Sequence, residues 1–305
     1  MTEAEQSGAS RAETPSSQAP GDGAAFEARD VTVRFGGLVA LDQVSVRVRS
    51  NEVLGVIGPN GAGKTTFFNV VCGFVQPAQG QLHWRGEELR RLRPHQLSRL
   101  GIARTLQGVG LFPGLTVLEN VMTGASRHIK AGFGSALLGL PKSDRDEKAL
   151  RDRAHQMLTE LNADDYTDRY PGSLPYPVQK RVALARALVA EPDLLLLDEP
   201  ASGLGADEMS ELGDTIRALG KRMSVMLVEH HMDLVMTVCN QITVFDFGKV
   251  IATGTPTEIS RDPAVAAAYL GEEIDQTHHG MHVIKELQAQ DASGTPAQEE
   301  QAGRA

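Results

Sequence analysis

A glycine-rich turn between a short apolar run and a helix-forming stretch constrains this chain more than any other feature. The apolar run covers residues 53–57, and the turn after it reads Gly58, Pro59, Asn60, Gly61, Ala62, Gly63, Lys64 and Thr65. Backbone N–H groups of such a turn point inward at phosphate oxygens, and the N-terminus of the following helix adds a favourable dipole. Glycine is required because the turn demands positive φ and close backbone approach. The pattern therefore predicts a phosphate-binding loop.

Side chains at the end of this loop have expected roles in holding a nucleotide. Lys64 can reach the β- and γ-phosphates, and the Thr65 hydroxyl can bind Mg²⁺. We expect Thr66, the next residue, to bind the nucleotide as well. A glycine-rich turn that precedes Lys and Thr by chance is the alternative, and the strand-then-helix context disfavours it.

A second apolar run ends in acidic residues. Residues 194–197 are all leucine, and Asp198 and Glu199 follow directly. Ligands of open α/β sheets bind at the carboxyl ends of the strands. We expect Asp198 to hold Mg²⁺, directly or through water, and Glu199 to polarise the attacking water as general base. A strand that merely ends in a polar turn is the alternative, which the phosphate-binding loop makes less favourable.

Strands and helices alternate along most of the chain, which is typical of a mostly parallel sheet flanked by helices. The expected strands cover residues 31–35, 44–48, 53–57, 194–197, 225–228, 241–245 and 249–252, and a short strand with a turn is expected within 81–89. The expected helices cover residues 65–73, 115–127, 144–161, 178–190 and 206–219, with a loop over 128–142.

Composition predicts disordered tails and excludes several protein classes. The net charge of −9 is uneven, with −3 in residues 1–25, −4 in residues 273–305 and only −2 between them. That central part has no basic excess to indicate nucleic-acid binding. No apolar run reaches the length of about 18 residues that a membrane span needs, and a signal-peptide pattern is absent from the N-terminus. The two cysteines show no pairing pattern and indicate a reducing compartment.

The C-terminal tail carries three histidines that could suggest a metal site: His278, His279 and His282. No acidic or thiol partner completes a site there, so metal binding is the less favoured interpretation. A short helix is expected around residues 282–287.

These motifs together resemble those of the ATP-binding subunits of ABC transporters, over about residues 26–272. Residues 103–107, followed by Leu-Phe-Pro at 111–113, resemble the Q-loop of that family. The resemblance implies that Gln107 contacts Mg²⁺ and the lytic water, and that it couples the site to a membrane subunit. His230, in a Val-Glu-His segment, resembles the switch histidine, which implies contact with the γ-phosphate.

The resemblance also implies that Phe35 stacks on adenine. Val31 and Val33 share a strand face with Phe35, so a plain core role for this residue stays open.

The fold implied by the resemblance is a P-loop NTPase core with an antiparallel β subdomain and a helical subdomain over about residues 108–190. The implied cofactors are ATP and Mg²⁺. The implied partners are transmembrane permease subunits, a second ATPase subunit, identical or different, and indirectly a solute-binding protein. The chain would work at the cytoplasmic face of a membrane, and no nucleic-acid partner is expected.

Branched-chain amino acid uptake is the subfamily that the chain most resembles. The stretches that suggest it are residues 33–38, the extra loop at 128–142 and residues 269–272. The loop is apolar enough to contact a protein partner, although an exposed loop is an equal alternative. ATPases of lipopolysaccharide export are similar over the same core. A soluble ABC ATPase that acts on ribosomes or DNA is disfavoured, because the chain has a single phosphate-binding loop and no basic patch.

The chain departs from the family pattern in the signature loop, which reads Leu174, Pro175, Tyr176, Pro177 and Val178 instead of Leu-Ser-Gly-Gly-Gln. In the resembling proteins this loop donates to the γ-phosphate bound by the partner subunit, but Pro175 has no hydroxyl and Pro177 no N–H. Gly205 also replaces an acidic or amide residue, and His231 an acidic one. We expect an asymmetric heterodimer with reduced turnover at the partner's site. Alternatively, a neighbouring N–H replaces the lost donor.

Overall fold

The computed structural model describes residues 23–105, 108–125 and 141–270. Gln107, nearly all of the loop expected at 128–142 and the three tail histidines lie outside these ranges. Among the described residues, none of the helices combines the length and the apolar character needed to cross a bilayer.

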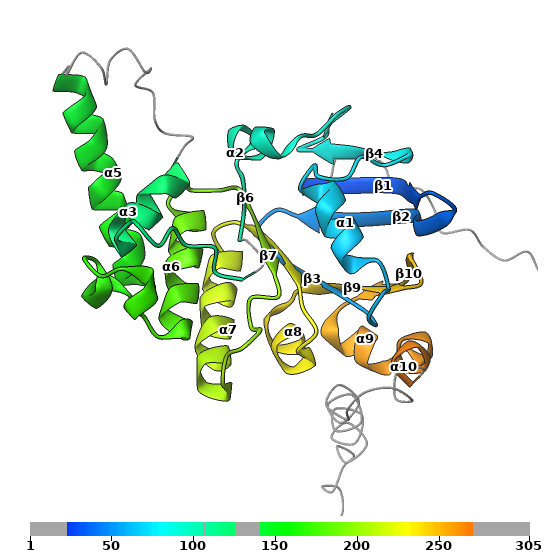
Figure 1. The fold of residues 1–305 in the computed structure, drawn as a ribbon. Helices are drawn as coiled ribbons and strands as arrows, with labels where there is room; N and C mark the ends of the chain where they lie inside the picture. The colour runs from blue at the N-terminus through cyan, green and yellow to red at the C-terminus, as the bar shows by residue number, and fades with distance from the viewer. Residues whose placement is uncertain (1–22, 106–107, 126–140, 271–305) are drawn as a thin grey trace, which may run out of the picture.

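A six-stranded sheet lies at the centre, in the order β10-β9-β3-β8-β7-β6 (Figure 1). Its neighbours pair in parallel from β9 to β6, and β10 pairs antiparallel with β9. The strands are β3 (Val53–Ile57), β6 (Ile102–Arg104), β7 (Leu194–Asp198), β8 (Ser224–Val228), β9 (Gln241–Asp246) and β10 (Lys249–Gly254). All the carboxyl ends from β9 to β6 therefore meet at one edge of the sheet.

The four leucines of strand β7 are buried on both faces of the central sheet. Leu195 and Leu197 pack into the core that the sheet shares with the helices of the helical subdomain. Leu194 and Leu196 face the opposite core, which lies between the two sheets. Burial on both faces is typical of a strand inside a parallel sheet covered on both sides.

A second, antiparallel sheet has the order β2-β1-β4-β5. Its strands are β1 (Ala24–Phe35), β2 (Leu38–Arg49), β4 (Gln79–Trp84) and β5 (Glu87–Glu88). The strands expected at 31–35 and 44–48 are confirmed as parts of the longer β1 and β2, which form a hairpin. Strand β1 begins at Ala24, two residues before the expected start of the domain.

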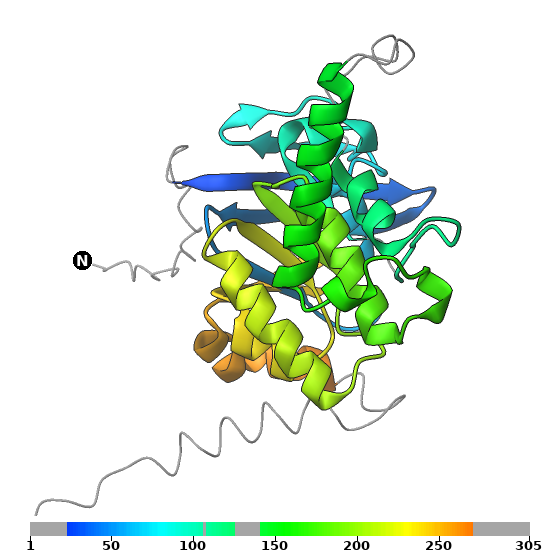
Figure 2. The same cartoon turned by 90° about the vertical axis from the view of Figure 1, so that its left-hand side faces the viewer.

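Three helices, α3, α5 and α6, pack on one another beside the central sheet and form the helical subdomain (Figure 1). Figure 2 views the molecule from that side, with the long green helix α5 in front. The helices are α1 (Lys64–Val71), α2 (Leu97–Leu100), α3 (Val117–Met122), α5 (Pro141–Glu160), α6 (Tyr176–Leu188), α7 (Ala206–Gly220), α8 (Met232–Val238), α9 (Pro256–Arg261) and α10 (Pro263–Leu270).

Several helix boundaries differ from expectation. The helix expected over 115–127 starts at Val117, because Thr116 caps it by accepting from the N–H of Glu119, and it gives way to a 3₁₀ turn at 123–125. Residues 141 and 142, expected in a loop, begin α5. Strand β6 and helices α2, α8, α9 and α10 were missed, since each is short.

Candidate functional site

The phosphate-binding loop joins β3 to α1 and is held by contacts that only glycine permits at two positions. Gly58 has φ 146°, and a Cβ there would lie 2.1 Å from the carbonyl oxygen of Phe245. Gly63 has φ 100°, and a Cβ there would lie 2.9 Å from the carbonyl oxygen of Ala40. A hydrogen bond from the N–H of Gly248 to the carbonyl of Ala62, at 3.0 Å, ties the loop to the β9–β10 turn. The loop is therefore preformed by neighbouring strands.

Lys64 lies at the start of α1, and its ammonium group turns back over the loop. Its Nζ donates to the carbonyl oxygens of Gly58, at 2.5 Å, and Pro59, at 2.8 Å. Thr65 is exposed and Thr66 half-buried on the first turn of the helix. The loop thus presents an ammonium group, two hydroxyls and a helix N-terminus together, which is the donor set that a nucleotide phosphate and its metal ion require.

The sheet brings three sequence-distant segments to the edge where this loop lies. Strand β8 pairs with β3 on one side and β7 on the other, with Val228 opposite both Val56 and Asp198. The phosphate-binding loop, the Asp198–Glu199 pair and His230 consequently follow three adjacent strands. Neighbouring strands lie about 4.8 Å apart, so all three segments border one site.

Asp198 is half-buried at the end of β7. Burial raises the pKa of its carboxyl, the nearby charges of Glu199 and Glu229 add to this effect, and Arg104 opposes it. A carboxylate that is costly to keep ionised without a counter-charge is suited to receive a cation. Glu199, the next residue, has φ 47°, a left-handed conformation that is strained for a side chain with a Cβ.

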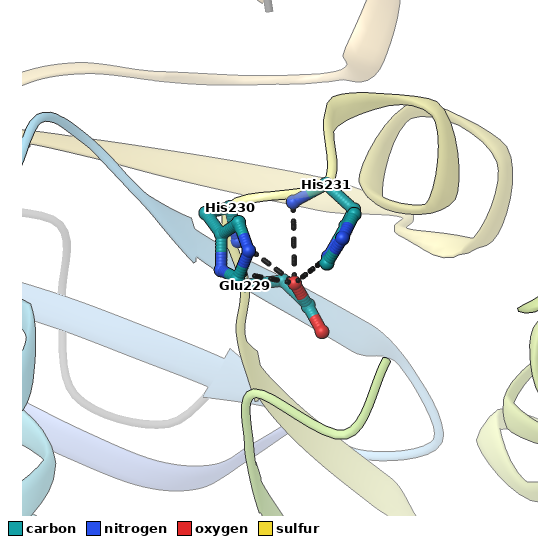
Figure 3. A group of neighbouring side chains, drawn as sticks. All are labelled: Glu229, His230 and His231. Atoms are coloured by element: carbon teal, nitrogen blue, oxygen red, sulfur yellow. Dashed lines mark hydrogen bonds and ion pairs between the residues drawn. The ribbon is translucent and has the colours of Figure 1, made fainter. Parts of the chain in front are cut away.

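His230 follows β8 at the same edge of the sheet, and 52% of its side chain is exposed. Its Nδ1 lies 3.7 Å from Oε2 of Glu229, and its ring centroid lies 4.1 Å from that of His231 (Figure 3). Glu229 is only 1% exposed. Sequence reasoning assigned no role to Glu229, because a glutamate between a valine strand and a histidine gives no sign that it will be buried.

Phe35 closes the tip of β1 and is 51% exposed, whereas Val31 and Val33 are almost completely buried. A plain core role for Phe35 is therefore wrong. Gly36 and Gly37 make the turn after it, and Phe35 pairs with Leu38 on β2. Its ring is accessible to a flat ligand.

The segment with the unusual signature sequence starts helix α6. Pro175 is its N-cap and Pro177 its second residue, so this first turn retains few N–H groups. The ring of Tyr176 packs near Gly203, where an added Cβ would lie 3.0 Å from it. Lys180, which sequence reasoning also missed, donates to the carbonyl of Pro200 at 2.7 Å. The start of α6 therefore packs against the turn that follows Glu199.

A groove of about 460 Å³ lies between the central sheet and the helical subdomain. Phe74 and Phe112, both more than half exposed, line it. Arg104 stacks on Phe74 with its guanidinium 4.7 Å from the ring centroid. Arg186 lines the groove too, and donates to the carbonyls of Val109 and Gly110 just after the expected Q-loop. The groove is thus both apolar and positively charged.

The fold and this site define the chain as an ATP-binding cassette. Residues 41–202 match the family model "ABC transporter", and residues 249–275 match "Branched-chain amino acid ATP-binding cassette transporter". A solved ATP-binding cassette of an ABC transporter in its ADP conformation superposes with a TM-score of 0.70 at 28% identity, covering 82% of this chain and 99% of that one.

Curated relatives narrow the family further. The chain is 40% identical to the high-affinity branched-chain amino acid transport ATP-binding protein BraF of Pseudomonas aeruginosa, over 81% of this chain and 98% of BraF. It is 39% identical to LivG of Escherichia coli, over 79% and 95%. It is 35% identical to the lipopolysaccharide export system ATP-binding protein LptB of Haemophilus influenzae, over 77% and 92%. The chain belongs to the ABC transporter family, as an ATP-binding subunit whose ATP hydrolysis is coupled to transport.

Proposed function

We propose that this chain energises an importer of branched-chain amino acids or related small solutes. The observation that carries the proposal is the meeting of the phosphate-binding loop, Asp198–Glu199 and His230 on three adjacent strand ends. The match of its C-terminal region to the branched-chain model supports the substrate class. Lipopolysaccharide export is the second candidate and has weaker support, because LptB is less similar than BraF and LivG.

In this proposal the loop from Gly58 to Thr65, with Thr66, binds the phosphates of ATP, and Lys64 neutralises the β- and γ-phosphates. Phe35 stacks on adenine, which its exposure permits. Thr65, Asp198 and Gln107 hold Mg²⁺. The ion supplies charge neutralisation on the phosphates, and its proposed ligands are hard oxygen donors of the type it prefers.

Glu199 acts as general base toward the attacking water, and His230 contacts the γ-phosphate. The exposed ring of His230 and the fixed turn at Glu199 support these roles. Gln107 would sense both the lytic water and the membrane subunit, and it lies outside the described residues.

The permease partner is proposed to dock in the groove lined by Phe74 and Phe112. The supporting observation is the pair of exposed aromatic rings beside the expected Q-loop, since such patches on a soluble surface mark interaction sites. The chain would then lie on the cytoplasmic face of the membrane and dimerise with a second ATPase subunit. A solute-binding protein would join the assembly only indirectly.

The signature segment, which is residues 174–178 at the start of α6, supports an asymmetric dimer. Of the N–H groups that a helix start offers to an anion, Pro177 supplies none and Tyr176 and Val178 remain. We propose that turnover is full at this chain's own loop and reduced at the loop of a different partner ATPase.

Reconstitution with two permeases, the partner ATPase and a solute-binding protein tests the function. We expect leucine-dependent stimulation of ATP hydrolysis and leucine uptake into vesicles. Stimulation by lipopolysaccharide-export partners, and not by an amino acid, would instead support the second candidate.

A further inference from the structure

We infer that Glu229 is a positioning residue for turnover, because one buried carboxylate holds both the turn after Glu199 and the backbone of His230. The inference rests on the proposed function, which gives Glu199 and His230 their roles. Glu229 lies beside the site, and the proposed function assigns it no role.

The two carboxylate oxygens of Glu229 serve different segments. Oε1 accepts the backbone N–H of Ala201 at 2.8 Å. Oε2 accepts the backbone N–H of His230 at 2.8 Å and that of His231 at 3.2 Å, and lies 2.9 Å from Nδ1 of His231 (Figure 3). The turn after β7 and the segment after β8 are therefore fixed to one rigid group.

These contacts favour an ionised carboxylate, since every backbone partner is a donor. Burial opposes ionisation of Glu229, and the hydrogen bonds from His231, Ala201 and His230 outweigh it, so its pKa lies below the usual value. A charge that is 1% exposed stays in place only while its hydrogen bonds are satisfied. The position of the carboxylate is thus strongly determined.

The turn after β7 that carries Glu199, here called the general-base turn, needs such support. Glu199 has a left-handed backbone, which persists only where surrounding structure over-determines it. Its own N–H donates to the carbonyl of Val228 at 2.9 Å, and Ala201, two residues on, donates to Glu229. Because Val228 and Glu229 are consecutive, the end of β8 sets the position of Glu199 relative to His230.

Metal binding is the competing interpretation, since ligand atoms of Glu229, His230 and His231 lie within 4.8 Å of one another. However, three nitrogens already lie within 3.2 Å of Oε2, and an ion bound there would have to disrupt these contacts. The contacts therefore favour a hydrogen-bonded hub, that is, a carboxylate that accepts backbone N–H groups from two segments, over a metal site.

Substitution Glu229→Gln tests the inference in the reconstituted transporter. An amide presents N–H groups to Ala201 on one side or to His230 on the other, so one segment is released. We expect kcat for ATP to fall about 10- to 100-fold, as misplacement of reacting groups does, with KM for ATP within about 2-fold because the phosphate-binding loop is untouched. Hydrogen exchange should accelerate in peptides that span Ala201 and His230, and stay unchanged at the phosphate-binding loop.

The matched control is Glu52→Gln. Glu52 is also a buried glutamate that accepts a backbone N–H, from Arg49, but it precedes β3 at the opposite edge of the sheet. We expect it to lower the melting temperature without lowering kcat. If Glu229→Gln does not fold, Glu229→Asp keeps the charge with a shorter reach and should show the same split between kcat and KM. His231→Asn, which keeps a donor near Nδ1, should lose less turnover than His231→Leu.

Equal kcat in Glu229→Gln and the parent, in a protein that binds and hydrolyses ATP, would overturn the inference alone. Loss of kcat matched by equal loss in Glu52→Gln would show a merely structural role. Calorimetric Zn²⁺ binding that needs all three side chains would replace the hub with a metal site. Absence of ATP binding by the parent chain would contradict the proposed function instead.

Discussion

The ammonium group of Lys180 donates to the backbone carbonyl oxygen of Pro200 at 2.7 Å, and so ties the start of α6 to the turn that carries Glu199. Burial lowers the pKa of Lys180, and the charges of Glu229 and Glu199 oppose that shift. The same ammonium lies 5.4 Å from the ring centroid of Tyr176. The signature segment and the general-base turn therefore form one packed unit within the chain.

Replacement of Lys180 by Met should loosen this unit. A hydrogen bond from a charged donor is worth about 1.5–3 kcal/mol, so we expect the free energy of unfolding to fall by about 1–2 kcal/mol and kcat for ATP to fall several-fold. Urea denaturation and steady-state kinetics measure these changes. Lys221→Met, an exposed lysine after α7, is the control and should change neither.

Lys64→Ala should abolish tight ATP binding, because it removes the ammonium group that lies over the phosphate-binding loop. The two charge-assisted contacts proposed between Lys64 and the β- and γ-phosphates correspond to about 3–6 kcal/mol, or more than 100-fold in Kd. Calorimetry with Mg²⁺ present measures it. Unchanged affinity in the variant would place the nucleotide elsewhere.

Asp198→Asn should stabilise the fold while it removes metal-dependent hydrolysis. The folded pKa of Asp198 is raised, so the folded state binds its proton more tightly than the unfolded state, and ionisation of this carboxyl destabilises the fold once pH exceeds the unfolded value near 3.8. We expect a higher melting temperature at pH 7, by a small amount because solvent screens the charge of a half-buried carboxyl. Scanning calorimetry without nucleotide checks the rise, and a fall in the melting temperature would contradict it.

The raised pKa of Asp198 should also make the affinity for Mg²⁺ depend on pH. Mg²⁺ competes with the proton on Asp198, so its apparent affinity in the ATP complex should fall as pH drops toward the raised pKa, which lies above 3.8. Titration of Mg²⁺ at several pH values measures this pH dependence. In Asp198→Asn the dependence should flatten.

Pro177→Gly should raise turnover at the partner's site. It restores an N–H in the first turn of α6, and one such donor toward developing charge is worth about 2.7–4 kcal/mol. We expect a roughly 10-fold or greater rise in a heterodimer whose other site is silenced. Pro177→Ala restores the same N–H and should act alike. No rise with either variant, at unchanged nucleotide affinity, would indicate that another group already fills the role.

Phe112→Ala should weaken association with the permease about 10-fold, since an exposed aromatic in a docking groove is a typical anchor. Asn120 holds the backbone of Phe112 on both sides, so the fold should tolerate the change. Affinity for ATP should not change. Tyr170→Ala, an equally exposed ring that does not line the groove, is the control for co-purification.

The sequence by itself determined the parts of this protein whose chemistry is local. The glycine pattern at 58–63 specifies a tight loop because Gly58, Gly61 and Gly63 take positive φ, which glycine adopts without a steric penalty. The leucine run before Asp198 specifies a strand buried on both faces, and its acidic end follows from chain order. These features depend on residues close in sequence, so they could be predicted from sequence together with the parallel, helix-flanked sheet.

Only the tertiary structure decided how distant segments meet. Glu229 became a buried hub because strand order sets β8 between β3 and β7 and brings Ala201 to its carboxylate. Phe35 proved exposed although its strand neighbours are buried, since the β1 hairpin ends beyond the core. Such contacts form across long sequence separations, and their energies depend on burial and on partners that no local pattern contains.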